Sequence, residues 1–525
     1  MRRLALLFAI CAAVFAAACS GGGSRPAPPP PAGGFSNSSL SGQYAFLMSG
    51  TDAGGFFGRV GVFVADGSGH ITGGIEDVNT GTSGEQTLPF SASTYTIQAD
   101  GRGTVQLTNQ TGTLTFSVTL LSTSQGYISQ TDAIATTSGT FNLQTPSTFT
   151  QNAINGPYVF DATGIAPDVN NNFFSDSIVG QLVASNGAIT GGVVDENFSA
   201  SLSGPQTVSN GTSTLDATNG TAFGRGTLSF TAGGSTFSYI YYIVDGSRVR
   251  MMETNTSALT LGDAVAQVNP PATNAAFTGS FAYLMGGSSA STGGPLTRIG
   301  RFTTDGNGGL VKIFGDTNDS GLADQAPSGS LSATTYVIDP NFPGSGRGTA
   351  TYTDSKLGPF SFIFYMASPS QGVIQDVSKN NVADGSIVAQ TGGPFSMSNL
   401  AGNWGLNWSG ISSNSSTQVT AEEDYVGHVA LTSSASNNLT GAVDFSEFSS
   451  NNGVFLDIVV NGPGLTIGGD GTTGDGNRNL LQAKINSNPS GTISFAAYVV
   501  NPNTIFVAGT DSNRIIAGTF SRQSQ

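Results

Sequence analysis

One sequence unit is repeated four times after the first 35 residues of this 525-residue chain. Each unit opens on a glycine that precedes an aromatic or apolar side chain by two positions, and these glycines recur at intervals of 114 to 123 residues. A repeat of this length predicts four copies of one folding unit. The glycines are Gly42, Gly156, Gly279 and Gly402, and the expected units span residues 36–148, 149–271, 272–394 and 395–525.

Three further landmarks recur inside the units. An aspartate closes an Ile-Thr-Gly-Gly segment or its counterpart, the first three units carry a Gly-Arg-Gly-Thr turn, and every unit ends on a glutamine. A single carboxylate repeated four times at a strand end is typical of an architectural hydrogen bond, either to a turn backbone or to the arginine of that turn. The aspartates are Asp77, Asp195, Asp316 and Asp444, the arginines Arg102, Arg225 and Arg347, and the glutamines Gln144, Gln267, Gln390 and Gln523. The fourth unit lacks the turn and has only Arg478 nearby.

Within a unit, apolar residues recur with a period of two, which predicts half-buried β-strands. Leu114, Phe116, Val118 and Leu120 alternate with serine and threonine. Asp-Gly, Asn-Gly and Gly-Gly pairs separate the segments, as tight hairpins require. We expect about eight strands per unit and minimal helix. In the first unit they are expected near Tyr44, Val62, Ile71, Pro89, Tyr95, Val105, Phe116 and Tyr127, with Phe141 closing the unit.

Eight hairpin-linked antiparallel strands can close into a small up-and-down barrel, which removes exposed strand edges. The openings Gly42/Tyr44 and Gly402/Trp404, with these hairpins, resemble the lipocalin and avidin group of barrels. A two-sheet sandwich is the competing architecture, and an eight-bladed propeller with two blades per unit is the third. Residues 237–243 and 360–366 are apolar on both faces, so a neighbouring unit covers them or they lie at the centre of a sandwich.

The N-terminus has the layout of an export signal. Arg2 and Arg3 precede an apolar stretch over 4–18, and small residues lead to Cys19. This segment resembles a bacterial lipoprotein signal, which implies that Cys19 carries the lipid and anchors the chain. The alternative is a secreted protein that is cut after an Ala-x-Ala site. Residues 20–35 are rich in glycine and proline, and we expect a tether. The resemblance implies an exported protein at the outer membrane or cell surface.

Composition excludes several partners and cofactors. The formal net charge of -15 and the pI near 4.3 argue against nucleic acid, which needs a basic surface. The two cysteines are Cys11, inside the expected signal, and Cys19, so no disulfide is expected in the exported chain. Packed cores are expected because 38% of the residues are hydrophobic.

The chain offers little catalytic chemistry, and we expect a protein that is not an enzyme and has no resident cofactor. Its two histidines, His70 and His428, are expected at the surface because neither recurs in the sister units. Calcium is the one metal considered, through Asp316, Asn318 and Ser320, and through the oxygen-rich loop at 470–477; solvated turns are the alternative for both.

The sequence therefore favours a lipid-anchored, non-enzymatic protein of the cell envelope that makes multivalent contacts with glycans or other proteins through an uncharged surface. A carrier of small apolar ligands is the alternative, with Tyr44, Tyr158, Phe281 and Trp404 as ligand contacts; core packing is the other interpretation of these aromatics. A secreted hydrolase that uses two carboxylates is the third hypothesis, and the adjacent pairs are Glu76/Asp77 and Asp195/Glu196.

Overall fold

The computed structural model describes residues 34–80, 84–255, 258–414, 419–434, 436–448, 453–468, 478–485 and 491–524. The expected signal with Cys11 and Cys19, most of the expected tether, and the loop at 470–477 lie outside these residues. The described chain is almost entirely strand, in four antiparallel sheets that follow one another along the sequence. We call these sheets barrels 1 to 4.

The first two barrels contain the following strands. Barrel 1 comprises β1 (Ser41–Asp52), β2 (Gly55–Asp66), β3 (His70–Asn79), β4 (Glu85–Phe90), β5 (Ser93–Ile97), β6 (Arg102–Asn109), β7 (Gly112–Leu120), β8 (Gln125–Gln130) and β9 (Ala135–Leu143). Barrel 2 comprises β10 (Gly156–Pro167), β11 (Phe173–Ser185), β12 (Ala188–Phe198), β13 (Ser201–Leu215), β14 (Arg225–Ala232), β15 (Ser235–Asp245), β16 (Arg248–Glu253) and β17 (Leu259–Ala266).

The last two barrels follow the same order. Barrel 3 comprises β18 (Thr278–Ser289), β19 (Gly294–Asp305), β20 (Leu310–Asp319), β21 (Leu322–Ala326), β22 (Leu331–Ile338), β23 (Arg347–Asp354), β24 (Gly358–Ser368), β25 (Gln371–Asp376) and β26 (Asn381–Ala389). Barrel 4 comprises β27 (Gly402–Asn414), β28 (Val419–Leu431), β29 (Leu439–Phe448), β30 (Gly453–Thr466), β31 (Arg478–Ile485), β32 (Gly491–Asn501), β33 (Thr504–Gly509) and β34 (Arg514–Arg522).

Among the described residues, helix is confined to single turns that precede or interrupt the sheets. These are the 3₁₀ turns η2 (Asn37–Ser39), η3 (Pro146–Thr148) and η4 (Asn274–Ala276), and the α-turns α1 (Gly220–Phe223) and α2 (Met397–Leu400). Among the described residues, no helix is long and apolar enough to span a membrane.

The prediction of four tandem antiparallel up-and-down barrels is confirmed, and the sandwich and propeller alternatives are not what forms. Barrels 2 and 4 are closed rings of eight strands, and in barrel 1 the pairing of β3 with both β2 and β5 completes the circuit. Barrel 3 is more open: its sheet runs from β21 to β22, and the isolated bridge between Gly309 and Thr335 links its two sides. The long strand β13 of barrel 2 corresponds to two short strands in barrels 1 and 3; β3 pairs with both β4 and β5, whereas, of the two in barrel 3, β20 pairs with β21 alone, and this leaves barrel 3 more open.

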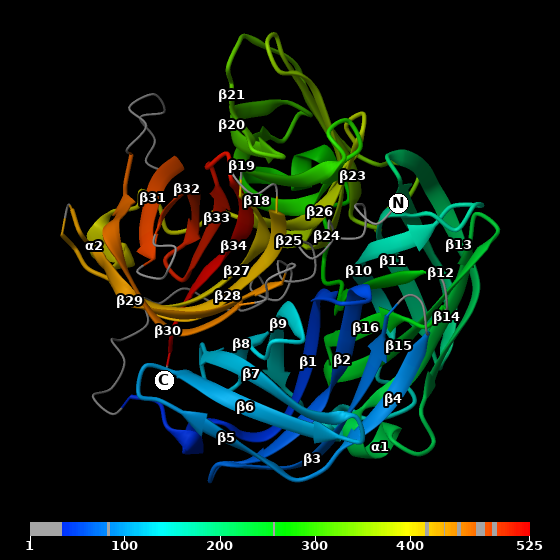
Figure 1. Ribbon diagram of the computed structural model, residues 1–525. Coiled ribbons are helices and arrows are strands. Elements are labelled where there is room, and N and C mark those ends of the chain that lie inside the picture. Colours follow the sequence, from blue (N-terminus) through cyan, green and yellow to red (C-terminus); the bar gives the residue numbers. More distant parts are fainter. Residues whose placement is uncertain are drawn as a thin grey trace.

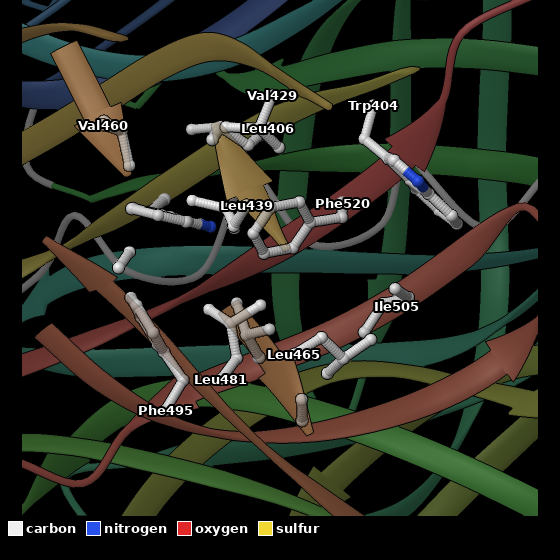
Figure 2. Packing of buried hydrophobic residues seen from close by; sticks show 14 of the residues in the cluster. Trp404, Leu406, Val429, Leu439, Val460, Leu465, Leu481, Phe495, Ile505 and Phe520 are labelled. Atoms are coloured by element: carbon white, nitrogen blue, oxygen red, sulfur yellow. The ribbon is translucent and has the colours of Figure 1, made fainter. Parts of the chain in front are cut away.

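Each barrel interior is filled by its own side chains. In β7, Leu114, Phe116, Val118 and Leu120 all enter the core of barrel 1, because alternate residues of a strand face the same side. Figure 2 shows the corresponding core of barrel 4, where Trp404, Leu406, Phe495 and Phe520 lie among aliphatic side chains from the surrounding strands.

The four barrels are arranged in a ring, with barrel 4 (orange to red) against barrel 1 (blue to cyan) in Figure 1. The outer face of the first strands of each barrel packs on the late strands of the next. A shared apolar cluster lies at each of the first three junctions: Leu47 and Val60 meet Ile240 and Tyr242, Val159 and Val179 meet Ile363 and Tyr365, and Leu284 and Ile299 meet Tyr498 and Phe506. This packing explains why β15 and β24 are apolar on both faces: one face fills their own barrel and the other is covered by the preceding barrel.

Trp408 provides a test of whether the barrel cores carry the stability. Its ring is fully buried and packs on Tyr425, Phe495 and Phe520 at centroid distances of 5.9, 4.8 and 5.5 Å. Trp408→Ala is expected to lower the free energy of unfolding of barrel 4 by about 3–5 kcal/mol, because it removes a large buried side chain and leaves a cavity. Urea unfolding followed by the fluorescence of the remaining Trp404 measures this loss. Trp408→Phe is the control and should cost much less; equal losses would contradict the packing explanation.

Candidate functional site

The recurring aspartates and arginines meet between barrels rather than within them. Asp77 of barrel 1 accepts two hydrogen bonds from Arg225 of barrel 2, each at 2.9 Å, and Asp195 of barrel 2 accepts two from Arg347 of barrel 3, at 2.7 and 2.9 Å. Asp316 of barrel 3 is paired in the same bidentate way with Arg478 of barrel 4. Each aspartate therefore binds the arginine of the following barrel.

A tyrosine completes each of these three junctions. Tyr242, Tyr365 and Tyr498 donate their hydroxyl protons to Asp77, Asp195 and Asp316 at 2.5, 2.6 and 2.8 Å. Burial raises the pKa of all three tyrosines well above the ordinary value, and the adjacent carboxylate raises it further. Each tyrosine therefore stays protonated and acts as a donor.

The arginines of these junctions are held in the charged state. Burial alone would lower the pKa of Arg225 and Arg347, but the hydrogen bonds and charges of Asp77 and Asp195 raise it above the ordinary value. A buried, bidentate pair of this kind fixes the relative position of two barrels, because neither charge can be left without its partner.

Two amides reinforce the contact. The side chain two residues after the aspartate donates to backbone carbonyls of the next barrel: Asn79 to Glu253 at 2.8 Å, Asn197 to Asn381 at 2.8 Å, and Asn318 to Gly509 at 2.9 Å. The glutamine that ends each unit also donates to carbonyls of the following barrel, Gln144 to Phe223, Gln267 to Met366, Gln390 to Val499 and Gln523 to Leu120. Because the last of these reaches barrel 1, the ring closes by the same head-to-tail contact that joins its other members.

The junction between barrels 4 and 1, which we call the seam, is a weaker version of the other three. Arg102 lies 3.8 Å from Asp444 and instead donates to Asp457 at 2.7 Å. Thr119 takes the place of the tyrosine, because it pairs with Arg102 across the sheet as Tyr242 pairs with Arg225. Among the described residues, only Leu121, Tyr127 and Val426 form an apolar cluster here.

Polar groups replace this apolar packing along the seam. Ser138 donates to Asn407 at 2.7 Å, Tyr127 shares a hydrogen bond with Ser521 at 2.8 Å, and Thr136 donates to Asp424 at 2.8 Å. Burial raises the pKa of Asp424 to about 7. Burial, followed by the charge of Asp424, raises the pKa of the neighbouring Glu422 well above its usual range. The seam therefore buries a pair of carboxyl groups that resist ionisation.

The four aromatic residues considered as ligand contacts all lie in the barrel cores. Tyr44 donates to the carbonyl of Thr123 at 2.7 Å, Trp404 donates to that of Leu400 at 2.9 Å, and the hydroxyl of Tyr158 donates to backbone carbonyls at 3.3 Å. Phe281 packs on Phe277 with ring centroids 4.4 Å apart. Each of the four is at most 2% exposed and packs in a barrel core. The two tyrosines and the tryptophan also bind backbone carbonyls.

The residues considered for calcium make other contacts. Asp316 binds Arg478, Asn318 donates to the carbonyls of Gly509 and Asp511, and Ser320 lies against Thr292 at 2.8 Å. No group of three or more His, Cys, Asp or Glu side chains among the described residues is placed to hold a metal ion.

The histidines and paired carboxylates are also separated by the fold. His70 is exposed and contacts Asp66 at 2.8 Å, but His428 differs from the surface position expected for it: its side chain is 14% exposed and lies 4.0 Å from Asp100 across the seam. Burial lowers the pKa of His428. Glu76 and Asp77 point to opposite faces of β3, because they are adjacent on a strand: Glu76 binds Arg59 at 2.9 Å and Asp77 binds Arg225.

The outward faces of the barrels carry ladders of uncharged polar side chains. Ser93 and Thr108, Thr212 and Ser229, and Thr335 and Thr351 form hydrogen-bonded pairs across neighbouring strands of barrels 1, 2 and 3. On barrel 4 this face is hollowed to a volume of about 740 Å³, and the hollow is lined by Asn437, Thr440, Asn461, Gln482, Lys484 and Thr492, among others. This hollow is the candidate binding surface.

Comparisons with known proteins give no family for this chain. No protein-family model matches it, and no curated protein matches it. Among solved structures, it is similar to one described as the structure of intact Ap-TbpB with its N and C lobes, at 10% sequence identity over 76% of this chain and 84% of that chain, with a TM-score of 0.17.

Several junction residues cannot be identified from the sequence alone. The Asp-x-Asn spacing is visible at Asp77, Asp195 and Asp316, and it marks two side chains on the same face of a strand. The tyrosines carry no such signal, because they lie 17 to 20 residues after the arginines in otherwise apolar strands. Arg478 serves as the fourth arginine although it lacks the Gly-Arg-Gly-Thr context.

Arg347→Ala tests the junction between barrels 2 and 3. It leaves the fully buried Asp195 without its cation, and we expect a loss of about 3–5 kcal/mol in the free energy of unfolding. Arg347→Lys should recover only part of this, because an ammonium cannot bind both carboxylate oxygens in the fork geometry. Arg102→Ala at the seam should cost less than Arg347→Ala. Urea unfolding measures all three, and an equal cost for Arg102 and Arg347 would contradict the ranking of the junctions.

The buried carboxyl pair predicts how stability depends on pH. The pKa of Asp424 is raised in the folded protein, so its contribution is complete below its ordinary value of about 4 and is lost as pH rises through about 7. The double variant Glu422→Gln/Asp424→Asn should flatten this alkaline loss. Urea unfolding midpoints between about pH 4 and 9 provide the measurement, because the loss begins above the ordinary pKa of the carboxyl group. If the double variant shows the same alkaline loss as the unchanged chain, the pair is not its cause.

Proposed function

We propose that this chain is a lipid-anchored, non-enzymatic protein of the cell envelope, in which a ring of four barrels presents an uncharged surface for multivalent contacts with glycans or with other proteins. The observation that carries the proposal is where the polar and apolar side chains lie. Barrel interiors and inter-barrel faces are filled, and the outward faces carry the Ser/Thr ladders and the hollow on barrel 4.

The geometry supports contacts of modest strength repeated around the ring. The four outward faces are held by one covalent chain, so an extended partner that meets one face is close to the next, and the linked sites raise the effective concentration. Hydroxyl and amide groups such as Thr440, Asn461 and Gln482 suit the hydroxyl-rich surface of a glycan, because each can donate or accept a hydrogen bond.

The alternative of a small apolar ligand inside a barrel has less support. Tyr44, Tyr158, Phe281 and Trp404 occupy the space that such a ligand would need, and their polar atoms already have backbone partners where they have any. A hydrolase that used Glu76 and Asp77 would need both on one side of the strand, which a strand does not provide.

Cys19→Ser tests the membrane anchor. If the cysteine carries the lipid, the variant should move from the membrane fraction to the soluble fraction and lose incorporation of a labelled fatty acid. Cys11→Ser is the matched control and should leave both unchanged, because Cys11 lies inside the segment that export is expected to remove. A Cys19→Ser chain that still incorporates fatty acid would contradict lipidation at this position.

Gln482→Ala and Lys484→Ala test the hollow. If it contributes to binding, signals on a glycan array or with an isolated envelope partner should fall by about threefold to tenfold, as expected for one or two lost hydrogen bonds. Gln106→Ala is the comparison on barrel 1, because Gln106 follows Arg102 in β6 as Gln482 follows Arg478 in β31. A smaller fall in binding is expected for Gln106→Ala than for Gln482→Ala, and equal falls would contradict a specific role for the hollow. Native mass spectrometry of the unchanged protein provides the competing readout: a stoichiometric apolar ligand would favour the carrier instead.

A further inference from the structure

One end of barrel 2 contains three carboxyl groups that face its interior. They come from Asp176 on β11, Glu196 on β12 and Glu253 on β16. Asp176 and Glu253 are each 3% exposed, and Glu196 is half-buried. Burial raises the pKa of Asp176 well above its usual range, and the charges of Glu196 and Glu253 raise it further, so the three groups are close enough to repel one another.

The sister barrels place a cation in this region. Arg59 pairs with Glu76 in barrel 1 at 2.9 Å, Arg298 with Asp376 in barrel 3 at 2.7 Å, and Arg514 with Glu423 in barrel 4 at 3.1 Å. Among the described residues, no arginine or lysine forms an ion pair with the three carboxylates of barrel 2.

Strand register identifies the substitution that removes the cation. Arg59 lies opposite Val78 and Arg298 opposite Thr317, each one residue beyond the junction aspartate. The residue in the same place in barrel 2 is Ile178, which lies opposite Glu196. Glu253 ends β16 as Asp376 ends β25, so barrel 2 keeps the acid of the barrel 3 pair and has isoleucine where its arginine stands.

The protein provides hydrogen-bond donors to only some of the oxygen atoms of these carboxyl groups. Glu253 accepts hydrogen bonds from Asn255 at 2.6 Å and Thr260 at 2.8 Å. Asp176 is buried, points into the same space, and its Oδ1 has no hydrogen-bond partner. A buried, unpartnered carboxylate oxygen is costly, and an incoming donor would remove that cost.

Two aromatic rings lie at the same end of barrel 2. Phe174 and Phe198 face the same side of their strands as Asp176 and Glu196, both are half-buried, and they meet edge-to-face at 6.1 Å. In the sister barrels the arginines lie over such rings, Arg59 over Phe57 at 5.2 Å and Arg298 over Phe360 at 4.6 Å. Aromatic faces attract organic cations, and guanidinium groups in particular.

We propose that this end of barrel 2 binds a guanidinium or alkylammonium group from outside the chain, in the region that arginine side chains of the protein itself fill in barrels 1, 3 and 4. A bound cation lowers the pKa values of Asp176, Glu196 and Glu253, which burial raises in its absence, so that these groups ionise and provide the negative charge. Phe174 and Phe198 provide the apolar wall. The described carboxylates are not placed to hold a metal ion, which favours a larger cation whose several N–H donors reach different carboxylates. The group comes either from a free amine or from a basic side chain of a partner protein. This site is independent of the lipid anchor and of the hollow on barrel 4.

Titration calorimetry of the full chain with arginine, agmatine and citrulline tests the proposal. Citrulline is the matched control ligand, since it replaces the guanidinium of arginine with an uncharged urea group. We expect one arginine or agmatine per chain, and citrulline at least about tenfold weaker, as expected when a charge-assisted hydrogen bond is lost. Equal binding of arginine and citrulline, or no binding of any of them, would overturn the proposal.

A capped Gly-Arg-Gly peptide distinguishes the sources of the cation. Binding by the peptide indicates a protein partner, whereas binding by the free amines alone indicates a small molecule.

Two variants locate the site. Ile178→Arg restores the cation of the sister barrels, and we expect it to abolish arginine binding and to raise the unfolding temperature. Val337→Arg adds the same charge to the exposed face of barrel 3 and should leave binding unchanged. Glu253→Gln provides a second route if Ile178→Arg does not fold, with an expected loss of at least about tenfold in affinity. Unchanged binding in a folded Ile178→Arg or Glu253→Gln chain would place the cation elsewhere and refute the site.

Discussion

The buried ion pair between the aspartate of one barrel and the arginine of the next is the interaction on which the ring depends. A closed barrel has no free strand edge and therefore cannot join its neighbour by extending a sheet. The neighbours join through their outer faces, and an apolar face alone would allow them to slide. Asp195 and Arg347 prevent this, because each charge is buried and each has its hydrogen-bonding geometry satisfied only in one register.

The ring has one junction that the chain does not bridge covalently, and that junction differs in chemistry from the others. The seam keeps the hydrogen bond from the terminal glutamine, Gln523, to a carbonyl of the next barrel. Among the described residues, it has no counterpart of the junction tyrosine, and its apolar cluster is smaller than those of the other junctions. Its contacts are hydroxyls, amides and the buried carboxyls Glu422 and Asp424, whose pKa values burial raises. Because these groups can also be solvated by water, closing the ring gains less free energy than joining two consecutive barrels. The ring is therefore most easily weakened at the seam.

Functional capacity in this architecture lies where the repeats differ. Residues common to all units are used for cores and junctions, so they are unavailable for partners. In barrel 4, Lys484 lines the hollow. In barrel 2, Ile178 stands where barrels 1 and 3 have Arg59 and Arg298. Duplication followed by local change thus leaves the scaffold intact while giving single barrels separate binding chemistry.

The sequence by itself determined the number of units and their strand content, and it favoured closure into barrels over a two-sheet sandwich. Repeated glycines, an alternation with period two, and Asp-Gly hairpins are local signals, and local signals survive in a single sequence. Strands of barrel 1 form around Tyr44, Pro89 and Phe141 as expected. The recurring Asp77, Arg225 and their counterparts were visible as landmarks, but nothing local indicates that the partner of each aspartate belongs to the next unit.

Only the tertiary structure decided that pairing, the ring, the seam and the burial of Trp404 and its counterparts. An aromatic residue two positions after a glycine is equally compatible with a ligand site and with a core. Which of the two it forms depends on the strands that surround it. In the same way, the sequence gives no sign that Glu196 lacks a nearby arginine; only the strand register of the described residues, which places Ile178 opposite Glu196, shows it. Contacts between residues more than a hundred positions apart depend on how whole barrels pack, and that information is spread over many side chains instead of one motif.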